Sequence, residues 1–380
     1  MTTLLKNARI ISPKSEIANG AVLIDQGRIM RVLSAGDAAP AADQVIDAEG
    51  KTLVPGFIDV HIHGGMGYEV TCDKPEAIET IAKAKLKEGV TSFCPTTLTI
   101  SEETLARSQK FIAAYRRNPT GSKVIGTHLE GPYINPKCVG AQNPAFVRKA
   151  DIAEIKRLDA ISSVSIITYA IEVEGNLEFT KLLRETHIVP SCGHTAATAA
   201  QMLEAKPFGL KRLTHFCNQM TKLHHREIGM VGLGLYDDDI TLEIICDKIH
   251  VCPDMIRLTF KSKPIDRILL ITDAMEATGL PDGNYQIGGL AVVVSDGAAR
   301  LASDGALAGS TLKLDQALRN VLEVTGRALP DVIQTTAWNQ AMNLGIDDLG
   351  KIEPGFVADL VLLDENLKVA GVFRDGQKLI

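Results

Sequence analysis

The chain has 380 residues, of which 45% are hydrophobic and 23% are charged, and this composition excludes an intrinsically disordered protein. The formal net charge of −6 and the pI near 5.9 argue against a nucleic-acid-binding protein, which needs a basic surface. The N-terminal segment MTTLLKNARIIS lacks the pattern of a signal peptide, and no apolar run is long enough to cross a bilayer.

Seven cysteines are scattered along the chain, and no two of them form a C-x-x-C pair. An odd number of dispersed cysteines indicates reduced thiols rather than a disulfide framework or a thiolate metal site. We therefore expect a cytoplasmic protein.

Both ends of the chain show the alternating apolar and polar pattern of short β-strands. The first 54 residues contain LKNARIIS, GAVLIDQGRIMRVLS and QVIDAEGKTLV, with a hairpin turn at Asp25-Gln26-Gly27. Residues 351–380 are also rich in strand patterns, with turns at Pro354-Gly355 and Asp375-Gly376. Neither end is long enough to close a core alone, so we predict one small β-sandwich domain made from residues 1–54 and 351–380.

Residues 55–350 alternate apolar runs with amphipathic helical patterns such as KPEAIETIAKAKLKEG and TAATAAQMLEAKP. Eight strands are predicted: FIDVHI, VTSFCPT, VIGTHLE, SVSIITYA, HIVPSCG, KRLTHF, TLEIICD and RILLITD. Eight short strands separated by helices indicate an α/β fold, a (β/α)8 barrel of the TIM type, rather than an open sheet.

Barrel enzymes carry their chemistry at the C-terminal ends of the strands. Five of the eight predicted strands end in side chains that can bind a metal: His61, His63, Glu130, His194, His215 and Asp273. His61 and His63 are two residues apart and therefore point to the same face of their strand. Imidazole and carboxylate ligands without thiolates suit Zn²⁺, Fe²⁺, Mn²⁺ or Co²⁺, any of which can generate hydroxide at neutral pH.

Each of these residues also has a structural interpretation when it is taken alone. A single histidine can be a hydrogen-bonded core residue, and Asp273 can be a helix N-cap. Cys192 lies close to His194 but has no positioned base, so a cysteine nucleophile is not favoured. His128 shares a face with Glu130, and we predict a structural or supporting role for it. The complete set on five strand ends favours a metal centre.

These motifs resemble the amidohydrolase superfamily and, within it, the N-acetylglucosamine-6-phosphate deacetylase family. The resemblance covers essentially the whole chain, through PGFIDVHIHGG, HLEGP, SCGHTAAT, LTHF with LHHREIG, TDAMEATG, LAGSTL and GKIEPGFVADLVLLD. It implies hydrolysis of the acetamide of N-acetylglucosamine 6-phosphate to glucosamine 6-phosphate and acetate.

The resemblance also implies the metal ligands. Glu130, His194 and His215 would hold the ion that all family members keep. Some members lack one histidine of the H-x-H pair and use one ion, whereas this chain has both His61 and His63. We therefore expect a second divalent ion there, with Glu130 bridging and Asp273 nearby. Asp273 would take a proton from the attacking water and pass it to the departing amine.

Substrate contacts follow from the same resemblance. Arg226 and His250 match residues that contact the sugar phosphate, and a guanidinium suits bidentate phosphate binding. The other expected substrate-binding residues are Ala141, Gln142, Asn218, Gln219, Leu307 and Ala308. Ser310 would cap the following helix. Independently of the resemblance, the long, glycine-rich connection 277–304 suggests a hairpin lid over the site. The family usually forms dimers, so we expect a homodimer.

The sequence departs from the family pattern at several positions. Gln142 stands where some relatives carry histidine, so a cationic role is lost at that position. Cys217 and Gln219 depart from the commoner L-F-N-A-M segment after the strand-six histidine. These changes affect the fine contacts to the substrate rather than the metal ligands.

Three alternatives stay open. Nothing in the sequence distinguishes the C4 epimer, N-acetylgalactosamine 6-phosphate. A cyclic-amide hydrolase would usually bridge its metals with a carboxylated lysine at the end of strand four, and SVSIITYAIE contains no lysine. A catalytically inactive scaffold would have lost metal ligands, but all six positions are intact.

Overall fold

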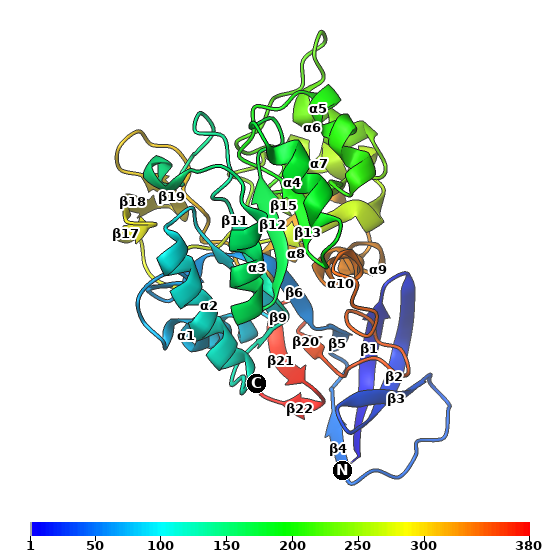
Figure 1. The fold of residues 1–380 in the computed structure, drawn as a ribbon. Coiled ribbons are helices and arrows are strands. Elements are labelled where there is room, and N and C mark those ends of the chain that lie inside the picture. The colour runs from blue at the N-terminus through cyan, green and yellow to red at the C-terminus, as the bar shows by residue number, and fades with distance from the viewer. Residues whose placement is uncertain (1) are drawn as a thin grey trace.

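The computed structural model describes residues 2–380 as a parallel α/β barrel attached to a β-rich unit (Figure 1). All eight predicted barrel strands are present: β6 (Phe57–Ile62), β9 (Val90–Thr97), β11 (Thr127–Glu130), β12 (Val164–Tyr169), β13 (Val189–Cys192), β14 (Arg212–Leu213), β15 (Thr241–Ile245) and β16 (Ile268–Ile271). Each strand pairs in parallel with the next, and the short β10 (Lys123–Val124) adds to β9. The predicted (β/α)8 architecture is confirmed.

The barrel strands form because most of their side chains are apolar or neutral on both faces. All eight residues of β9 and all six of β6 are buried, as expected for strands that are covered by helices outside and by packed side chains inside. The barrel is nearly closed: the segment that follows β16 meets β6 through one parallel bridge, Ile62 to Ala274. This narrow closure brings the segment after β16 against the end of β6.

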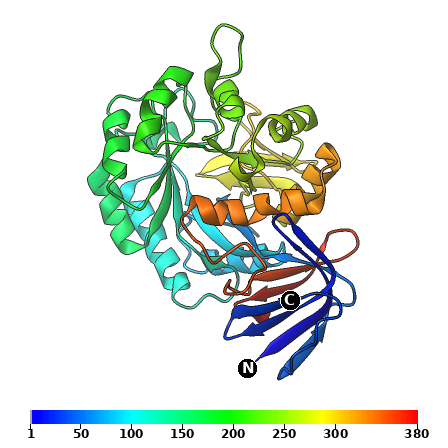
Figure 2. The same cartoon turned by 90° about the vertical axis from the view of Figure 1, so that its right-hand side faces the viewer.

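Within residues 2–380, ten α-helices connect and cover the strands (Figures 1 and 2): α1 (Ala77–Leu86), α2 (Glu102–Arg116), α3 (Ile152–Ile161), α4 (Asn176–Leu183), α5 (Ala199–Ala205), α6 (Gly229–Tyr236), α7 (Pro253–Ser262), α8 (Leu314–Thr325), α9 (Leu329–Val332) and α10 (Trp338–Asn343). The sequence specifies several of their ends. Thr198 caps α5 in a reciprocal capping box with Gln201, and Ser101 caps α2. In α8, Leu314, Leu318 and Val321 form the apolar stripe that faces the barrel.

The two ends of the chain meet in one eight-stranded sheet (Figure 1). Its N-terminal strands are β1 (Thr3–Ser12), β2 (Ser15–Asp25), β3 (Arg28–Leu33), β4 (Gln44–Asp47) and β5 (Thr52–Pro55). Its C-terminal strands are β20 (Leu360–Leu363), β21 (Val369–Arg374) and β22 (Gln377–Lys378), and β5 pairs with β20 antiparallel. The prediction that both termini join in one β-rich unit is confirmed, and the predicted β-sandwich takes the form of a single eight-stranded sheet.

This terminal sheet curls around a core of its own. Ile29 of β3 and Phe373 of β21 lie in the same buried cluster, although they belong to opposite ends of the strand order. Backbone hydrogen bonds from Ile29 to Phe356 and from Ala358 to Gly27 complete the closure, at 2.9 and 2.8 Å. The other face, with Val361 and Val372, packs against the barrel cluster. We retain 1–54 and 351–380 as the proposed limits of this unit.

The predicted turns appear, and the 277–304 connection forms strands. Gln26 and Gly27 have φ of 48° and 77° between β2 and β3, the left-handed pair of a tight hairpin turn. A three-stranded antiparallel sheet, β17 (Gly283–Ile287), β18 (Leu290–Ser295) and β19 (Ala298–Leu301), occupies the 277–304 connection (Figure 1). A short hairpin, β7 (Gly64–Gly65) with β8 (Tyr68–Glu69), follows β6.

Candidate metal centre

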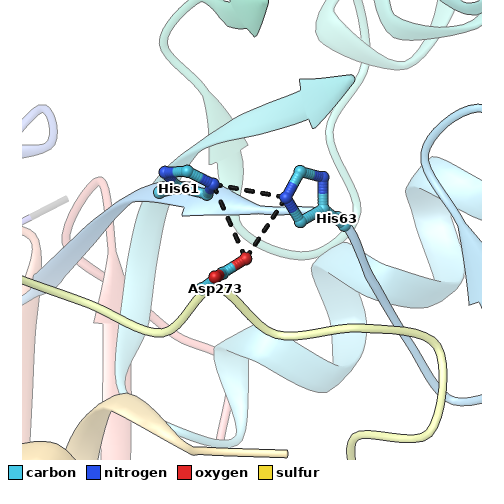
Figure 3. Close-up of side chains that lie close together, drawn as sticks. All are labelled: His61, His63 and Asp273. Atoms are coloured by element: carbon cyan, nitrogen blue, oxygen red, sulfur yellow. Dashed lines mark hydrogen bonds and ion pairs between the residues drawn. The ribbon is translucent and has the colours of Figure 1, made fainter. Parts of the chain in front are cut away.

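The six strand-end residues predicted as ligands converge at the C-terminal mouth of the barrel. His61 and His63 project from the end of β6, and Asp273 lies on the segment that follows β16 (Figure 3). Two backbone hydrogen bonds hold these segments together, from Asp273 N to His61 O and from His63 N to Ala274 O, each 2.9 Å long. The barrel closure thus places the aspartate beside the histidine pair.

The first trio consists of His61, His63 and Asp273. The two Nε2 atoms are 3.2 Å apart, and Asp273 Oδ1 lies 3.6 Å from His61 Nε2 and 3.2 Å from His63 Nε2 (Figure 3). All three residues are buried. Their ligand atoms therefore point to one small volume.

The second trio consists of Glu130, His194 and His215. Glu130 Oε1 lies 3.3 Å from His194 Nε2 and 3.0 Å from His215 Nε2, and these two nitrogens are 3.0 Å apart. Glu130 also faces the first trio, at 3.4 Å from His61 Nε2 and 3.2 Å from His63 Nε2. Glu130 thus belongs to the second trio and also faces the first, as a ligand shared by two ions would.

The orientation of the imidazoles shows what fits between them. Three of the four rings direct Nδ1 at an oxygen acceptor: His61 at Glu243 Oε2 (2.9 Å), His63 at Thr96 O (3.2 Å) and His194 at Cys138 O (2.8 Å). A proton on each Nδ1 leaves a lone pair on each Nε2. Glu130 Oε1, although close to three Nε2 atoms, has no hydrogen-bond donor among the described residues. Lone pairs that face a buried carboxylate oxygen need a cation, and this donor set fits a divalent metal.

The electrostatics of the protein lead to the same conclusion. Burial alone would raise the pKa of Glu130, but His61, His194 and His215 hold that pKa well below its usual range. Burial would lower the pKa of His63, yet Asp273 and Glu130 outweigh it and raise the pKa to about 10. The cluster therefore attracts positive charge, which either protons or a metal can supply.

Backbone strain is concentrated at the same residues. His194, His215 and Asp273 have φ of 48°, 32° and 52°, in the left-handed region that non-glycine residues seldom adopt. Such conformations persist where the surroundings impose them, and they are typical of functional sites. Three predicted ligands therefore have a backbone conformation that propensity alone would not select.

Two neighbouring residues behave as the sequence predicts. His128 is fully buried, with Nδ1 2.9 Å from Val60 O and Nε2 2.7 Å from Thr168 Oγ1, and burial lowers its pKa to about 3. It is a neutral structural histidine under the site. Burial raises the pKa of the Cys192 thiol to about 12, which disfavours the thiolate needed for a nucleophile.

A cavity of about 220 Å³ opens onto the ligand cluster. Besides five of the six predicted ligands, it is lined by Gly140, Ile287, Gly309 and six of the eight predicted substrate-binding residues: Ala141, Gln142, Asn218, Gln219, His250 and Leu307. The other two lie elsewhere. Ala308 is buried beside β19, where its N–H donates to Ala299 O, and Arg226 is on an exposed loop with its guanidinium 2.8 Å from His225 Nε2.

Gln142 is fully engaged within the site. Its Oε1 accepts from Thr99 N at 2.6 Å, and its Nε2 donates to Glu130 Oε2. The bond from Thr99 fixes the amide, and the amide Nε2 orients the Glu130 carboxylate. Gln142 therefore supports Glu130 at the wall of the cavity.

Two expectations about the loops have different outcomes. Ile287 of β17 lines the cavity, so the 277–304 sheet does reach the site. Ser310 does not cap a helix: α8 begins at Leu314 after Lys313, with no side-chain cap. Instead Ser310 Oγ donates to Thr272 O at 2.5 Å, and Ser310 N donates to Asp273 O at 2.7 Å. The serine is used to hold the aspartate segment because that segment packs directly against it.

Sequence reasoning missed a buried ionic pair beneath the metal centre. Glu243 of β15 and Arg212 of β14 are 0% and 1% exposed, and Arg212 Nε donates to Glu243 Oε1 at 2.8 Å. Burial would raise the pKa of Glu243, but Arg212 and His61 lower it. The available signal was a single glutamate inside the apolar strand TLEII, since a buried carboxylate requires a cationic or hydrogen-bonded partner.

Comparisons with known proteins agree with this site. The family model described as "Amidohydrolase family" matches residues 52–379. N-acetylgalactosamine-6-phosphate deacetylase of Escherichia coli O157:H7 is 38% identical, with 99% of each chain covered. N-acetylglucosamine-6-phosphate deacetylase of Bacillus subtilis (strain 168) is 35% identical, covering 96% of this chain and 94% of the relative. The crystal structure of N-acetylglucosamine-6-phosphate deacetylase from Thermotoga maritima superposes with a TM-score of 0.90 at 36% identity, covering 99% of each chain.

Proposed function

The chain belongs to the amidohydrolase family, and we propose that it hydrolyses the acetamide of N-acetylglucosamine 6-phosphate to glucosamine 6-phosphate and acetate. The observation that carries the proposal is Glu130, which stands between two trios of ligands in a chain that matches deacetylases over nearly its whole length. Its position supports a bridging glutamate, and β12 contains no lysine that could take that role in a cyclic-amide hydrolase.

We propose two divalent ions per chain. Glu130, His194 and His215 would hold one ion, and His61, His63 and Asp273 the other, with Glu130 shared. Zn²⁺ and Fe²⁺ suit these ligands best, and Mn²⁺ or Co²⁺ are compatible with them. Bound metal supplies Lewis acidity, which makes water a nucleophile near neutral pH and polarises the acetamide carbonyl.

Asp273 is the proposed proton carrier. It lies on the cavity wall with its carboxylate at the histidine pair, within reach of a water that attacks the acetamide. His61 and His63 lower its pKa against the effect of burial, so the carboxylate is ionised and able to accept a proton. The same group can then deliver that proton to the departing amine.

The phosphate end of the substrate is assigned to His250 and to Arg226 of a second chain. His250 lines the cavity and is held by Asp247, with Nδ1 2.6 Å from Oδ2. Arg226 is exposed and lies outside the cavity of its own chain. This placement supports the proposed homodimer, in which the loop with Arg226 lies near the interface. Sedimentation at micromolar concentration tests it, and a monomer would count against it.

A cytoplasmic location is proposed on the basis of the thiols. All seven cysteines are free, which suits a reducing compartment. Within residues 2–380, no helix combines the length and the apolar character that crossing a membrane requires.

The galactosamine epimer is a second candidate substrate, since one relative with 38% identity over 99% of both chains is named for it. The two sugars differ at one hydroxyl, and kcat/KM for both substrates decides between them. A ratio above one for the glucosamine substrate supports our assignment, and a ratio below one transfers it to the epimer.

The deacetylase proposal is tested by measuring acetate release alongside metal content. Fast release from N-acetylglucosamine 6-phosphate with bound metal is the expected result. Bound metal without release from either sugar would contradict the deacetylase but leave a hydrolytic metal centre. A protein that shows no bound metal and no activity after reloading with Zn²⁺ or Fe²⁺ would contradict both the deacetylase and the hydrolytic metal centre.

A further inference from the structure

We propose that Glu243 is a positioning residue that orients His61 for metal binding, and that Arg212 fixes Glu243 in this role. The inference rests on the proposed metal-dependent function. It assigns Glu243 to the first trio, His61 with His63 and Asp273, rather than to the site as a whole.

The geometry places Glu243 between two fixed partners. One carboxylate oxygen, Oε2, lies 2.9 Å from His61 Nδ1, and the other, Oε1, accepts from Arg212 Nε at 2.8 Å. Arg212 also donates through Nη1 to Asn343 Oδ1, so the guanidinium is anchored on both sides. Glu243 is completely buried, so water does not compete for these contacts. The carboxylate therefore cannot turn away from the imidazole.

A carboxylate at Nδ1 has two consequences for His61. It keeps the proton on Nδ1 and so presents the Nε2 lone pair to the metal, and it makes the ring a stronger ligand. The other ligand histidines lack this partner. His63 and His194 face the neutral backbone oxygens of Thr96 and Cys138, and His215 Nδ1 has no hydrogen-bond partner among residues 2–380.

The two trios are therefore supported unequally. His61 is the one ligand histidine whose second nitrogen faces a carboxylate in the described chain. His194 and His215 would hold their ion with Glu130. Glu243 touches this trio only through one long bond, 3.4 Å, from the backbone N–H of His215 to Oε2, and it contacts neither imidazole of the trio. Removal of the carboxylate should thus weaken one ion and spare the other.

The test compares Glu243→Gln with the control Glu154→Gln. Glu154 is a matched residue: it is 3% exposed, is paired with Arg148 and accepts from Tyr133 Oη at 2.9 Å, but it touches no predicted ligand. Each protein is loaded with Co²⁺ and dialysed against increasing concentrations of a chelator. Metal content and the visible absorption of the bound Co²⁺ are both measured.

The wild type and Glu154→Gln should keep two ions per chain over the same range of chelator. Glu243→Gln should lose one ion at a free-metal concentration about 10–100-fold higher than the wild type does, and keep the other. The absorption spectrum should lose the contribution of one ion only. Two ions held with unchanged affinity by folded Glu243→Gln would overturn the inference.

A second variant controls for misfolding of Glu243→Gln, which leaves the buried Arg212 without its charged partner. The double variant Arg212→Met with Glu243→Leu has a neutral, apolar core of similar volume, and such replacements are often tolerated. It should also lose one ion, and retention of both would overturn the inference. A wild type that binds a single ion would overturn it too. If the wild type binds two ions and Glu243→Gln loses one of them, but the wild type releases no acetate, only the deacetylase proposal would be contradicted.

Discussion

The Nε2 atoms of His61 and His63 lie 3.2 Å apart, and both rings direct their other nitrogen at an oxygen acceptor. In neutral imidazoles this arrangement turns two lone pairs toward each other and toward Asp273 (Figure 3). The contact is favourable only when a cation is shared between the groups. The protein should therefore be more stable with metal than without it.

Removal of metal by a chelator should lower the unfolding temperature, and addition of Zn²⁺ or Fe²⁺ should restore it. An ion present at 100 times its dissociation constant stabilises the folded state by about 3 kcal/mol. Differential scanning calorimetry before and after chelation, with metal content measured on the same samples, checks this. An unchanged unfolding temperature after complete removal would contradict the metal-centre interpretation.

Replacement of Asp273 by asparagine should preserve the fold and the second-trio ion but lose most turnover. Asparagine keeps the shape and an oxygen donor at this position but cannot carry the proton, and general acid–base transfer of this kind is typically worth about 10²–10⁴-fold. Acetate release, metal content and unfolding temperature are measured together. Turnover close to that of the wild type would place the proton carrier elsewhere.

Replacement of Lys85 by methionine should destabilise the barrel strongly. Lys85 is 2% exposed, and its Nζ lies 3.1 Å from Asp59 Oδ2 and 2.6 Å from Glu88 Oε2, so the change leaves two buried carboxylates without their cation. Breaking such a buried set costs about 3–5 kcal/mol. Urea unfolding measures the effect.

Lys83→Met on the same helix is the control for Lys85→Met. Lys83 pairs with Glu79 at the surface, where both side chains are largely exposed. Exposed ion pairs contribute at most about 1 kcal/mol. Similar decreases in the free energy of unfolding for Lys85→Met and Lys83→Met would contradict the prediction that burial makes the Lys85 ion pairs more stabilising.

Lys263 should make stability depend on pH in the alkaline range. The residue is 4% exposed, its Nζ donates to Asp237 O, and burial lowers its pKa from 10.5 to about 8. Below pH 8 both the folded and the unfolded chain are protonated at this position, and the cost of burying the charge is fully present. Between about pH 8 and 10.5 the unfolded chain binds more protons, so the free energy of unfolding rises with pH.

Urea unfolding of the wild type and of Lys263→Met at pH 7 and pH 9.5 tests this dependence. The free energy of unfolding of the wild type, relative to that of Lys263→Met, should be higher at pH 9.5 than at pH 7. Lys261→Met removes an exposed lysine from α7, which ends just before Lys263, and should show no such shift. The prediction would be contradicted if the wild type and Lys263→Met differed in free energy of unfolding by the same amount at both pH values.

One error in the sequence interpretation, the helix cap assigned to Ser310, has a clear physical cause. Ser310 precedes α8 and has a capping residue's chemistry, but it bonds Thr272 and Asp273 because the barrel closure brings that segment within reach. The phosphate role of Arg226 stays a prediction, since this residue is exposed and lies outside the cavity of its own chain. Local pattern describes what a side chain can do, and its neighbours decide which bond it makes.

The sequence by itself determined the eight barrel strands, the β-rich terminal unit and the identity of the six candidate ligands. These features follow from local periodicity and from the rule that functional side chains lie at strand ends. Only the tertiary structure decided that Glu130 stands between two trios, and that Glu243 and Arg212 support His61 from neighbouring strands. The reason is physical: distances between side chains on different strands depend on register and barrel closure, and these are set by packing over the whole chain.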